Sequence, residues 1–230
     1  MNTLIHTRSL QAAATGVLLA ALSLAGCAAT GGPTDEFSHD GLQKVRYTGL
    51  DEAWVRPDTD LSGYTKLMIR DSEIEYRAVR DRRVGPARDS EFPLTDSQKA
   101  RLQDIFQDTL REELGKSRRL ELTDTPGPDV LRIDAKLLDV VSRVPPDRGG
   151  ARSDVYISSV GEATVQIELR DAESGEILAR SVDRREAAHR RDPYRLERSA
   201  APLNWAQVQR EARRTAAQIR DYVETLHRGG

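Results

Sequence analysis

The stretch that decides the fold is VGEATVQIELRDAESGEILARSVDRREA, residues 160–187. On both sides of DAESG, at 171–175, apolar residues alternate with polar ones, which is the pattern of a half-buried strand. The acidic and small residues of DAESG favour a tight turn, in which Gly175 can adopt a positive φ angle. The sequence therefore predicts an antiparallel hairpin, with strands over 155–170 and 176–187.

Further strands are predicted upstream of the hairpin. In VLRIDAKLLDVV, at 130–141, apolar residues at every second position indicate a strand with one face in the core and the other in water. RRLELTD, at 118–124, is a shorter candidate. In YTKLMIRDSEIEYR, at 64–77, the alternation changes phase between Ile69 and Ile74, which predicts a bulge or a break in a long strand.

A first helix is predicted between these strands. Thr95 and Gln98 have the spacing of a capping box, and Gly115 is placed to end the helix. Its apolar positions share one face. They are Leu102, Ile105, Phe106, Thr109, Leu110 and Leu114.

A second helix is predicted near the end of the chain, where Asn204 and Gln207 repeat the capping pattern. The helix is roughly 22 residues long and amphipathic. Its apolar line comprises Trp205, Val208, Ala212, Thr215, Ala216, Ile219, Tyr222, Val223 and Leu226. This line covers the sheet in the simplest interpretation, and docking of a partner subunit is the alternative.

The order of these elements predicts an α+β fold. A mainly antiparallel sheet of about four to five strands carries the two helices packed on one face. We expect one such domain over residues 44–228, since its length suits a single domain of moderate size.

The N-terminus has the layout of an export signal. MNTLIHTRSLQ carries Arg8 and no acid, and AAATGVLLAALSLAG follows as an apolar core that is too short for a stable membrane span. Leu24, Ala25, Gly26 and Cys27 then resemble the lipobox of bacterial lipoproteins. Residues 1–26 are therefore expected to be a lipoprotein signal peptide.

Cys27 is the expected lipidation site and the only cysteine in the chain. A thiolate is the side chain best suited to take a diacylglyceryl group, and stable anchoring needs more than one acyl chain, such as palmitate. An uncleaved signal anchor and a buried free cysteine are the alternatives. Because residue 28 is alanine and not aspartate, we expect the anchor in the outer membrane, facing the periplasm, with the inner membrane as the alternative.

Residues 27–43 are expected to form a flexible tether, because they are small, polar and contain glycine and proline. The chain has 35 Lys and Arg residues against 37 Asp and Glu, and loss of the signal removes one arginine and no acid, so the net charge goes from −2 to −3. This near-neutral balance argues against nucleic acid as a main partner. With Cys27 lipidated, no disulfide or thiolate metal site remains.

Three stretches resemble a known family of bacterial lipoproteins, the domain of unknown function 3313. They are LDEAWVRPDTDLSGYTKLMI, DVLRIDAKLLDV and VGEATVQIELRDAESGEILARSVDRR. The resemblance covers about residues 42–226. It implies a place in the bacterial envelope, and it implies no activity and no catalytic residues.

The residues themselves indicate no catalytic site, metal site or cofactor. Among the four histidines, only His189 lies near predicted structure, and no two have the spacing of metal ligands. The acids and His39 of DEFSHD, at 35–40, are interpreted as solvated tether, with a divalent cation site as the alternative. The acids around the 171–175 turn are interpreted as turn formers, with a catalytic carboxylate pair as the alternative.

Two arginine clusters are the most distinctive surfaces, because arginine binds carboxylates and phosphates through paired hydrogen bonds. Acids are interleaved with them, so self-paired charge is the alternative to a binding patch. The candidate patch comprises Arg77, Arg80, Arg82, Arg83, Arg184, Arg185, Arg190 and Arg191.

We therefore expect a non-enzymatic, lipid-anchored periplasmic lipoprotein that acts as an adaptor or accessory subunit of a cell-envelope assembly, with an envelope protein as its partner. The alternative is a binding module for an anionic envelope component, either a lipid headgroup or peptidoglycan, through the arginine-rich loops. A hydrolase acting on cell wall or lipid is the third class.

Overall fold

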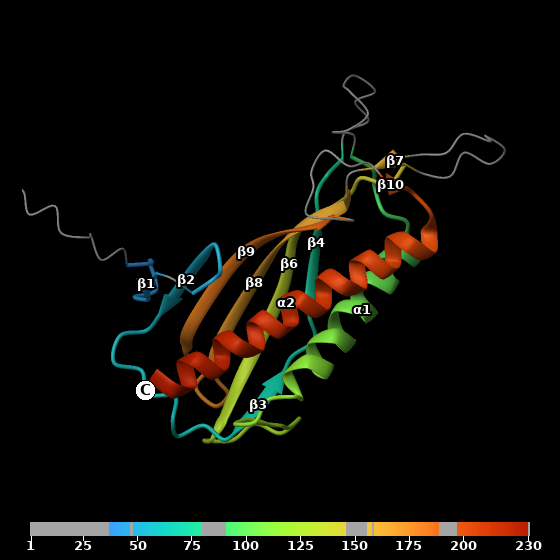
Figure 1. Ribbon diagram of the computed structural model, residues 1–230. Helices are drawn as coiled ribbons and strands as arrows, with labels where there is room; N and C mark the ends of the chain where they lie inside the picture. Colours follow the sequence, from blue (N-terminus) through green and yellow to red (C-terminus); the bar gives the residue numbers. More distant parts are fainter. Residues whose placement is uncertain are drawn as a thin grey trace, which may run out of the picture. The chain divides into compact units, whose positions relative to one another are not determined.

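The computed structural model describes residues 37–46, 48–79, 91–145, 156–157, 159–188 and 197–229. Residues 35–230 form one compact unit. In this unit two helices, α1 (Asp96–Leu114) and α2 (Ala201–Gly229), lie side by side on one face of a sheet (Figure 1). The predicted α+β class and the placement of both helices on one face are therefore confirmed.

Within the described ranges, the sheet has eight strands, and its hydrogen-bonded order is β1, β2, β9, β8, β6, β3, β5, with β4 also paired to β6. The central strands are β6 (Val130–Ser142), β8 (Ser159–Asp171) and β9 (Ile177–Ala188). The shorter strands are β1 (Gln43–Val45), β2 (Glu52–Val55), β3 (Lys66–Ile69), β4 (Glu73–Tyr76) and β5 (Glu121–Leu122). A separate pair joins β7 (Tyr156–Ile157) to β10 (Glu197–Arg198).

The predicted hairpin is β8 and β9, and Gly175 in its turn has a φ of +73°. The side chain of Asp171 orders this turn by accepting hydrogen bonds from the backbone N–H groups of Glu173 and Ser174, at 3.1 and 2.6 Å. Tyr64 donates a further hydrogen bond to Asp171 at 3.0 Å. The hairpin prediction is confirmed.

The predicted strand number of four to five is wrong, and the sheet is mixed. β3 and β4 both pair with β6 in parallel, and β5 pairs in parallel with β3. The physical reason is that α1 connects β4 to β5 and β6, and a helix crossover returns the chain in its original direction. β1 and β2 add an antiparallel extension beside β9.

The predicted break in the 64–77 strand separates β3 from β4. Gln107 of α1 accepts hydrogen bonds from both the backbone N–H and the hydroxyl of Ser72, at 3.0 and 2.8 Å. Gln103, one turn earlier, donates to the Ser72 carbonyl at 2.7 Å. The break thus gives α1 a polar attachment to the sheet.

The predicted cap of α1 is present. Thr95 and Gln98 form a complete capping box, and Gly115 is the C-cap with a φ of −65°. A Cβ at Gly115 would lie 3.0 Å from the Arg111 carbonyl oxygen and 3.2 Å from a Leu122 methyl group, so close approach explains the glycine.

The second helix begins earlier than predicted. α2 starts at Ala201 and has 29 residues, and the backbone N–H of Asn204 already donates to the Ala200 carbonyl at 2.9 Å. Asn204 is therefore inside the helix and is not its cap. Pro202 is compatible with this start, because a first-turn residue has no helical acceptor for its N–H.

The core lies between the sheet and the helices. Leu131, Ile133, Ala135 and Leu137 of β6 are all buried, as their alternation predicts. They pack with the apolar faces of α1 and α2 in one hydrophobic cluster.

The segment predicted as a tether enters the described fold at Phe37, which forms a bridge with Gln43. Leu42 is fully buried, and Asp40 pairs with Arg180 at 2.5 Å. Residues 37–43 therefore pack on the domain as ordered structure.

Candidate functional site

A cavity of about 1000 Å³ lies between the two helices and the sheet, and we call it the helix–sheet cavity. The N-terminal halves of α1 and α2 form one side, and the adjoining parts of β6, β8 and β9 form the other. Most of its lining is apolar. The apolar residues include Leu94, Leu102, Ile105, Phe106, Leu137, Val140, Val141, Val160, Val165, Trp205, Val208 and Ala212.

The elements place this lining by ordinary periodicity. Leu102, Ile105 and Phe106 stand on the sheet-facing side of α1, one turn or less apart. Trp205 and Val208 repeat that spacing on α2. The guanidinium of Arg101 lies 4.6 Å from the centre of the Trp205 ring, so a cation–π contact joins the two helices beside the cavity.

Two polar side chains on the cavity wall have a buried atom without a hydrogen-bond partner among the described residues: Arg185 at Nε and Asn204 at Oδ1. The Arg185 side chain is 18% exposed and pairs with Asp183 of the same strand. Asn204 is 6% exposed, and its Nδ2 donates to the Ser199 hydroxyl at 2.9 Å. Each residue thus has one satisfied group and one unsatisfied group.

Burial raises the pKa of Asp183, and the charge of Arg185 opposes that rise. The backbone N–H of Asp51 also donates to Asp183, at 3.4 Å. Residues two apart on a strand point to the same face of the sheet. Because Arg185 lines the cavity, Asp183 also lies on the face that carries the helices. This end of the sheet therefore presents a buried ion pair to an otherwise apolar layer.

Glu162 also lies on the cavity wall and is the centre of a second group of charges, the Glu162 cluster. It binds Arg77 at 2.8 Å, Arg184 at 3.0 Å and Arg143 at 3.2 Å. Burial alone would raise the pKa of Glu162, but the hydrogen bonds from the three arginines outweigh it and lower the pKa. Glu162 is therefore an ionised structural anchor.

Arg77 has two further carboxylate partners in the Glu162 cluster. It pairs with Glu91 at 2.5 Å and with Asp139, which has a φ of +57° at a bulge in β6. The three arginines of the cluster therefore meet three carboxylates.

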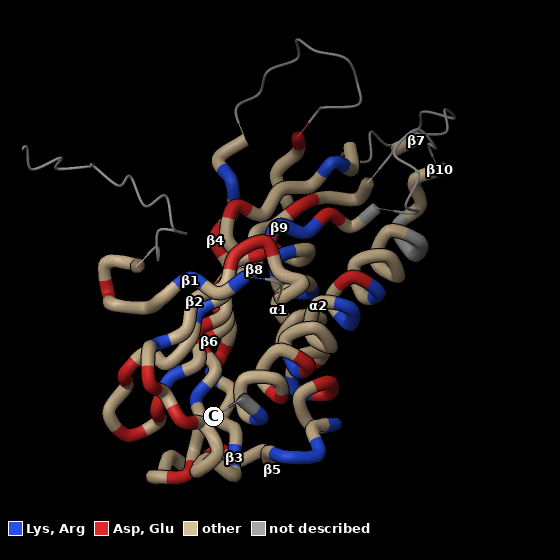
Figure 2. Tube along the Cα trace, turned by 60° about the vertical axis from the view of Figure 1, so that its left-hand side comes forward, with Lys and Arg blue, Asp and Glu red and all other residues tan. Residues whose placement is uncertain are grey.

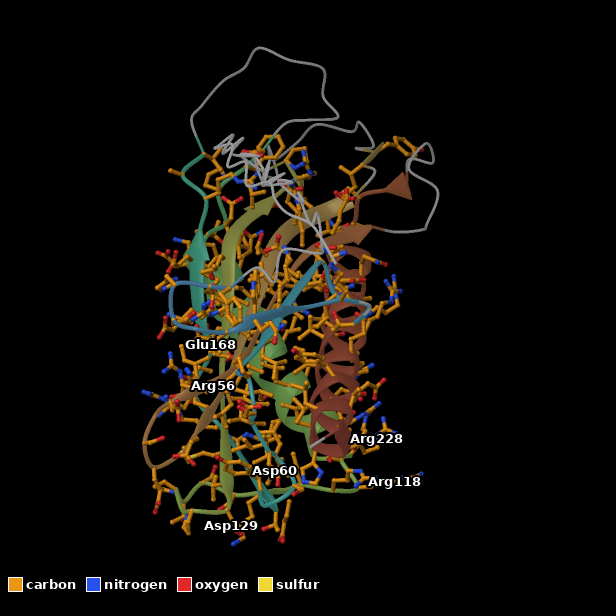
Figure 3. The ribbon with its side chains drawn as sticks, turned by 90° about the vertical axis from the view of Figure 1, so that its left-hand side faces the viewer. Arg56, Asp60, Arg118, Asp129, Glu168 and Arg228 are labelled. Atoms are coloured by element: carbon orange, nitrogen blue, oxygen red, sulfur yellow. The ribbon has the colours of Figure 1, made fainter. Side chains whose placement is uncertain are left out.

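A third group, the Glu168 cluster, lies on the face of the sheet away from the helices, since Glu168 alternates with the core residues Ile167 and Leu169. Glu168 binds Arg170 at 2.5 Å and Arg180 at 2.9 Å. Glu168 lies on the strand side of the molecule (Figure 3). Burial would raise its pKa, and the two arginines lower it.

The Glu168 cluster continues to both sides. Arg170 also pairs with Asp134 at 3.1 Å, and Arg180 with Asp40 at 2.5 Å. Hydrogen bonds from Ser38 first and Arg180 next lower the pKa of Asp40 to about 2. Blue and red residues are accordingly interleaved along the strands (Figure 2).

The structure places the described members of the predicted arginine patch beside carboxylates. Arg77 and Arg184, from its two separate halves, meet at Glu162, and Arg185 pairs with Asp183. All three are held by carboxylates, which is the self-paired interpretation. The remaining candidates lie outside the described residues, as does the lipidation site. They are Arg80, Arg82, Arg83, Arg190, Arg191 and Cys27.

Within the described ranges, no group of three or more His, Cys, Asp or Glu side chains is placed to hold a metal ion. No helix in the same part of the chain is long and apolar enough to cross a membrane. His227, near the end of α2, bonds through Nε2 to the Tyr64 carbonyl at 2.9 Å.

Fold and site together define an α+β domain with an apolar cavity under two parallel helices. The chain belongs to the family described as "Protein of unknown function (DUF3313)", whose match covers residues 34–219. The predicted family resemblance is therefore confirmed. No match was found among curated protein sequences.

Solved structures with a similar arrangement are distant. PelC from Paraburkholderia phytofirmans, solved as a dodecamer, is 11% identical with a TM-score of 0.33, over 73% of this chain and 95% of PelC. A Xanthomonas campestris protein is 9% identical with a TM-score of 0.42, over 76% and 91% of the two chains. A candidate lipoprotein from Caulobacter crescentus is 15% identical with a TM-score of 0.31, over 72% and 92%. Likeness at this level transfers no ligand or partner.

The helix–sheet cavity was not predicted from the sequence. Periodicity marks Leu102 and Val208 as inward-facing but does not distinguish a filled core from an unfilled one. Asn204 was interpreted as a cap, although it stands on the same face as Val208 and Glu211. That spacing was the available signal.

Proposed function

We propose that this protein is a lipid-anchored envelope lipoprotein whose domain is a non-enzymatic binding subunit, and that the helix–sheet cavity is its binding site. The observation that carries the proposal is the size and lining of that cavity, about 1000 Å³ between apolar faces of two layers. Protein interiors are normally close-packed, so a cavity of this volume is unusual in a core. Its volume is within the range of small-molecule binding sites.

The charged groups around the cavity support binding over catalysis. Glu162 is held by three arginines, Glu211 by Arg214 at 2.6 Å, and Arg185 by Asp183. A general acid or base must exchange its proton near the working pH, and groups fixed in ion pairs are poorly suited to that. The cavity wall is therefore better suited to binding a ligand by shape and hydrogen bonds than to transferring a proton.

The anchor is proposed at Cys27, which would hold the domain at the periplasmic face of the outer membrane. Labelled palmitate should enter the full chain and should not enter a Cys27→Ser variant, which should also leave the membrane fraction. Unchanged labelling or localisation of the Cys27→Ser variant would contradict the anchor and leave the cavity proposal to be judged separately.

The binding role is tested by asking whether the full chain carries a ligand. Mass spectrometry of the chain purified from membranes should detect a bound small molecule, and Ala212→Trp, which places an indole in the cavity, should remove it. Arg213→Trp is the matched control, because the next residue of α2 is exposed. A bound-molecule profile that is identical in all three proteins would refute the proposed function.

The accessory-subunit role predicts a defined protein partner. A photocrosslinking residue at Phe37 or Tyr156, which are both 56% exposed, should capture one protein in intact envelopes. The same residue at the exposed Thr125 is the control for random capture. If all positions give the same diffuse products, the protein acts without a fixed partner.

A further inference from the structure

The helix–sheet cavity has a shape that restricts its ligand. Its α1 lining runs from Thr95 to Phe106 and its α2 lining from Asn204 to Thr215. Eleven helical steps correspond to about 16 Å on each helix. The hydrocarbon core of a bilayer is about 30 Å thick, so the acyl chains of one leaflet span about 15 Å. The cavity therefore has the length of one acyl chain.

The apolar chemistry of the cavity wall also favours an acyl chain as the ligand. Apolar side chains from the two helices and the sheet would surround a hydrocarbon chain. A hydrocarbon chain has no polar atoms, so it needs no hydrogen-bond partners along this wall. A compact polar ligand would instead need several hydrogen-bond partners along that wall. The charged groups there, Glu162 and Glu211, are already held by arginines.

Two polar atoms remain for a headgroup. Among the described residues, neither Arg185 Nε, a donor, nor Asn204 Oδ1 has a hydrogen-bond partner, and Asn204 is only 6% exposed. Rotation of the Asn204 amide would exchange Oδ1 for Nδ2, with the Ser199 hydroxyl then donating. The site can thus offer a second donor or an acceptor. A carboxyl group or an ester with a neighbouring hydroxyl matches either arrangement.

We propose that the helix–sheet cavity binds a single-chain acyl amphiphile, with its chain between α1, α2 and the sheet and its oxygen headgroup at Arg185 and Asn204. Both helix N-termini lie at this end of the domain, and their partial positive charge favours an anionic head. This inference rests on the proposed binding role, because it names the ligand class of the same site.

The test uses the full chain in phosphatidylcholine nanodiscs with a diazirine-bearing palmitic acid as the probe. After irradiation, the label should map to peptides containing Leu102 or Val208, and excess unlabelled palmitate should suppress it. Labelling spread over exposed peptides, or labelling that palmitate does not suppress, would overturn the inference.

Variants test the headgroup assignment. Arg185→Gln should weaken the apparent affinity for the probe by about tenfold or more, which is the usual cost of losing a charge-assisted hydrogen bond. Asn204→Leu, which keeps the side-chain volume, should also weaken it. Arg213→Gln is the matched control, because Arg213 is exposed on α2 and is not part of the cavity wall. Equal effects of Arg185→Gln and Arg213→Gln would overturn the assignment.

A competition experiment identifies whether the bound acyl chain belongs to a free fatty acid or to a lysolipid. Palmitate and lysophosphatidylethanolamine share the acyl chain, and the stronger competitor identifies a free acid or a lysolipid. Either result supports the inference. If Ala212→Trp displaces a bound molecule that has no acyl chain, the cavity is a binding site and the acyl inference is wrong. If no bound molecule is displaced, the proposed function fails first.

Discussion

Two single carboxylates, Glu162 and Glu168, each organise a group of charges in the described part of this protein. Glu162 and Glu168 each hold two or more arginines, and both are almost fully buried. Removing one partner from such a group leaves a buried charge without compensation, which is far more costly than losing an exposed pair. Several arginines of this arginine-rich sequence therefore serve internal ion pairs.

The pairing of Asp40 with Arg180 predicts a pH dependence. The pKa of Asp40 is about 2 in the fold and near 3.9 when unfolded, so its stabilising contribution is complete above about pH 4 and is lost as the pH falls towards 2. Asp40→Asn should flatten the fall in unfolding free energy over that range, measured by urea denaturation. Ser38→Ala should shift the dependence part of the way, since Ser38 is the largest cause of the low pKa.

Gly161 predicts a steric effect. A Cβ at this position would lie 2.4 Å from the Val141 carbonyl oxygen on the neighbouring strand, so Gly161→Ala should destabilise the fold by about 1–3 kcal/mol. Gly63→Ala is the control, because a Cβ there meets no atom within 4 Å. Similar unfolding free energies for the two variants would show that the strands adjust without cost.

At the scale of elements, α1 is fixed at several points. Its capping box fixes the start of the helix. Gln103 and Gln107 form hydrogen bonds with Ser72 in the break between β3 and β4. Near its end, the buried Glu113 forms an ion pair with Arg220 of α2 at 3.1 Å. The helix is thus positioned by polar contacts at its start, middle and end, while its apolar face completes the core.

The cap predicts a measurable loss. Thr95→Ala removes the hydroxyl that accepts from the Gln98 N–H at 3.3 Å and should destabilise the protein by about 1 kcal/mol. Thr95→Ser keeps the hydroxyl and should retain most of the stability. Thermal unfolding of the two variants measures the difference, and an equal loss in both would assign it to the lost methyl group.

The elements also show what sequence could predict. β6, the β8–β9 hairpin and the sheet-facing side of α1 were predictable, because each carries its own periodicity or cap. β1 and β2 were not, because three or four residues are too few for a periodic signal, and their pairing with β9 is a long-range contact. The parallel pairing of β3 and β4 with β6 was implied by the strand–helix–strand order, but the antiparallel hairpin dominated the prediction.

The candidate site was less predictable than the fold. Self-pairing of Arg77 and Arg184 was an alternative in the sequence, because acids are interleaved with them. Their meeting at Glu162 was not predictable, since Glu162 is 85 residues from Arg77 and 22 from Arg184. A cavity depends on packing between three elements, and no single segment contains that information.

At the scale of the whole molecule, α1 and α2 are joined by polar contacts at their C-terminal ends, and the cavity lies beneath their N-terminal halves. Glu113 binds Arg220, and Glu224 accepts from Ser117 at 3.0 Å. Polar contacts therefore hold the C-terminal ends of the helices together, while their N-terminal halves, joined by the Arg101–Trp205 contact, cover the binding space.

Ligand binding should consequently stabilise the whole domain. Palmitate at 100 times its dissociation constant should add about 2.7 kcal/mol to the unfolding free energy of the full chain, seen as a higher melting temperature. Ala212→Trp should melt at one temperature with or without palmitate, and Arg213→Trp should respond as the unaltered protein does. A palmitate effect that persists in Ala212→Trp would place binding elsewhere.

Because α2 follows every described strand of the sheet along the chain, the helix that covers the cavity is synthesised after the rest of the described domain. Until then, the apolar row of β6 and β8 is open to solvent, as it would be in a molecule clipped before residue 201. Such a molecule would expose an apolar surface of the kind that holdase chaperones and quality-control proteases recognise. The described core is therefore complete only once α2 has docked.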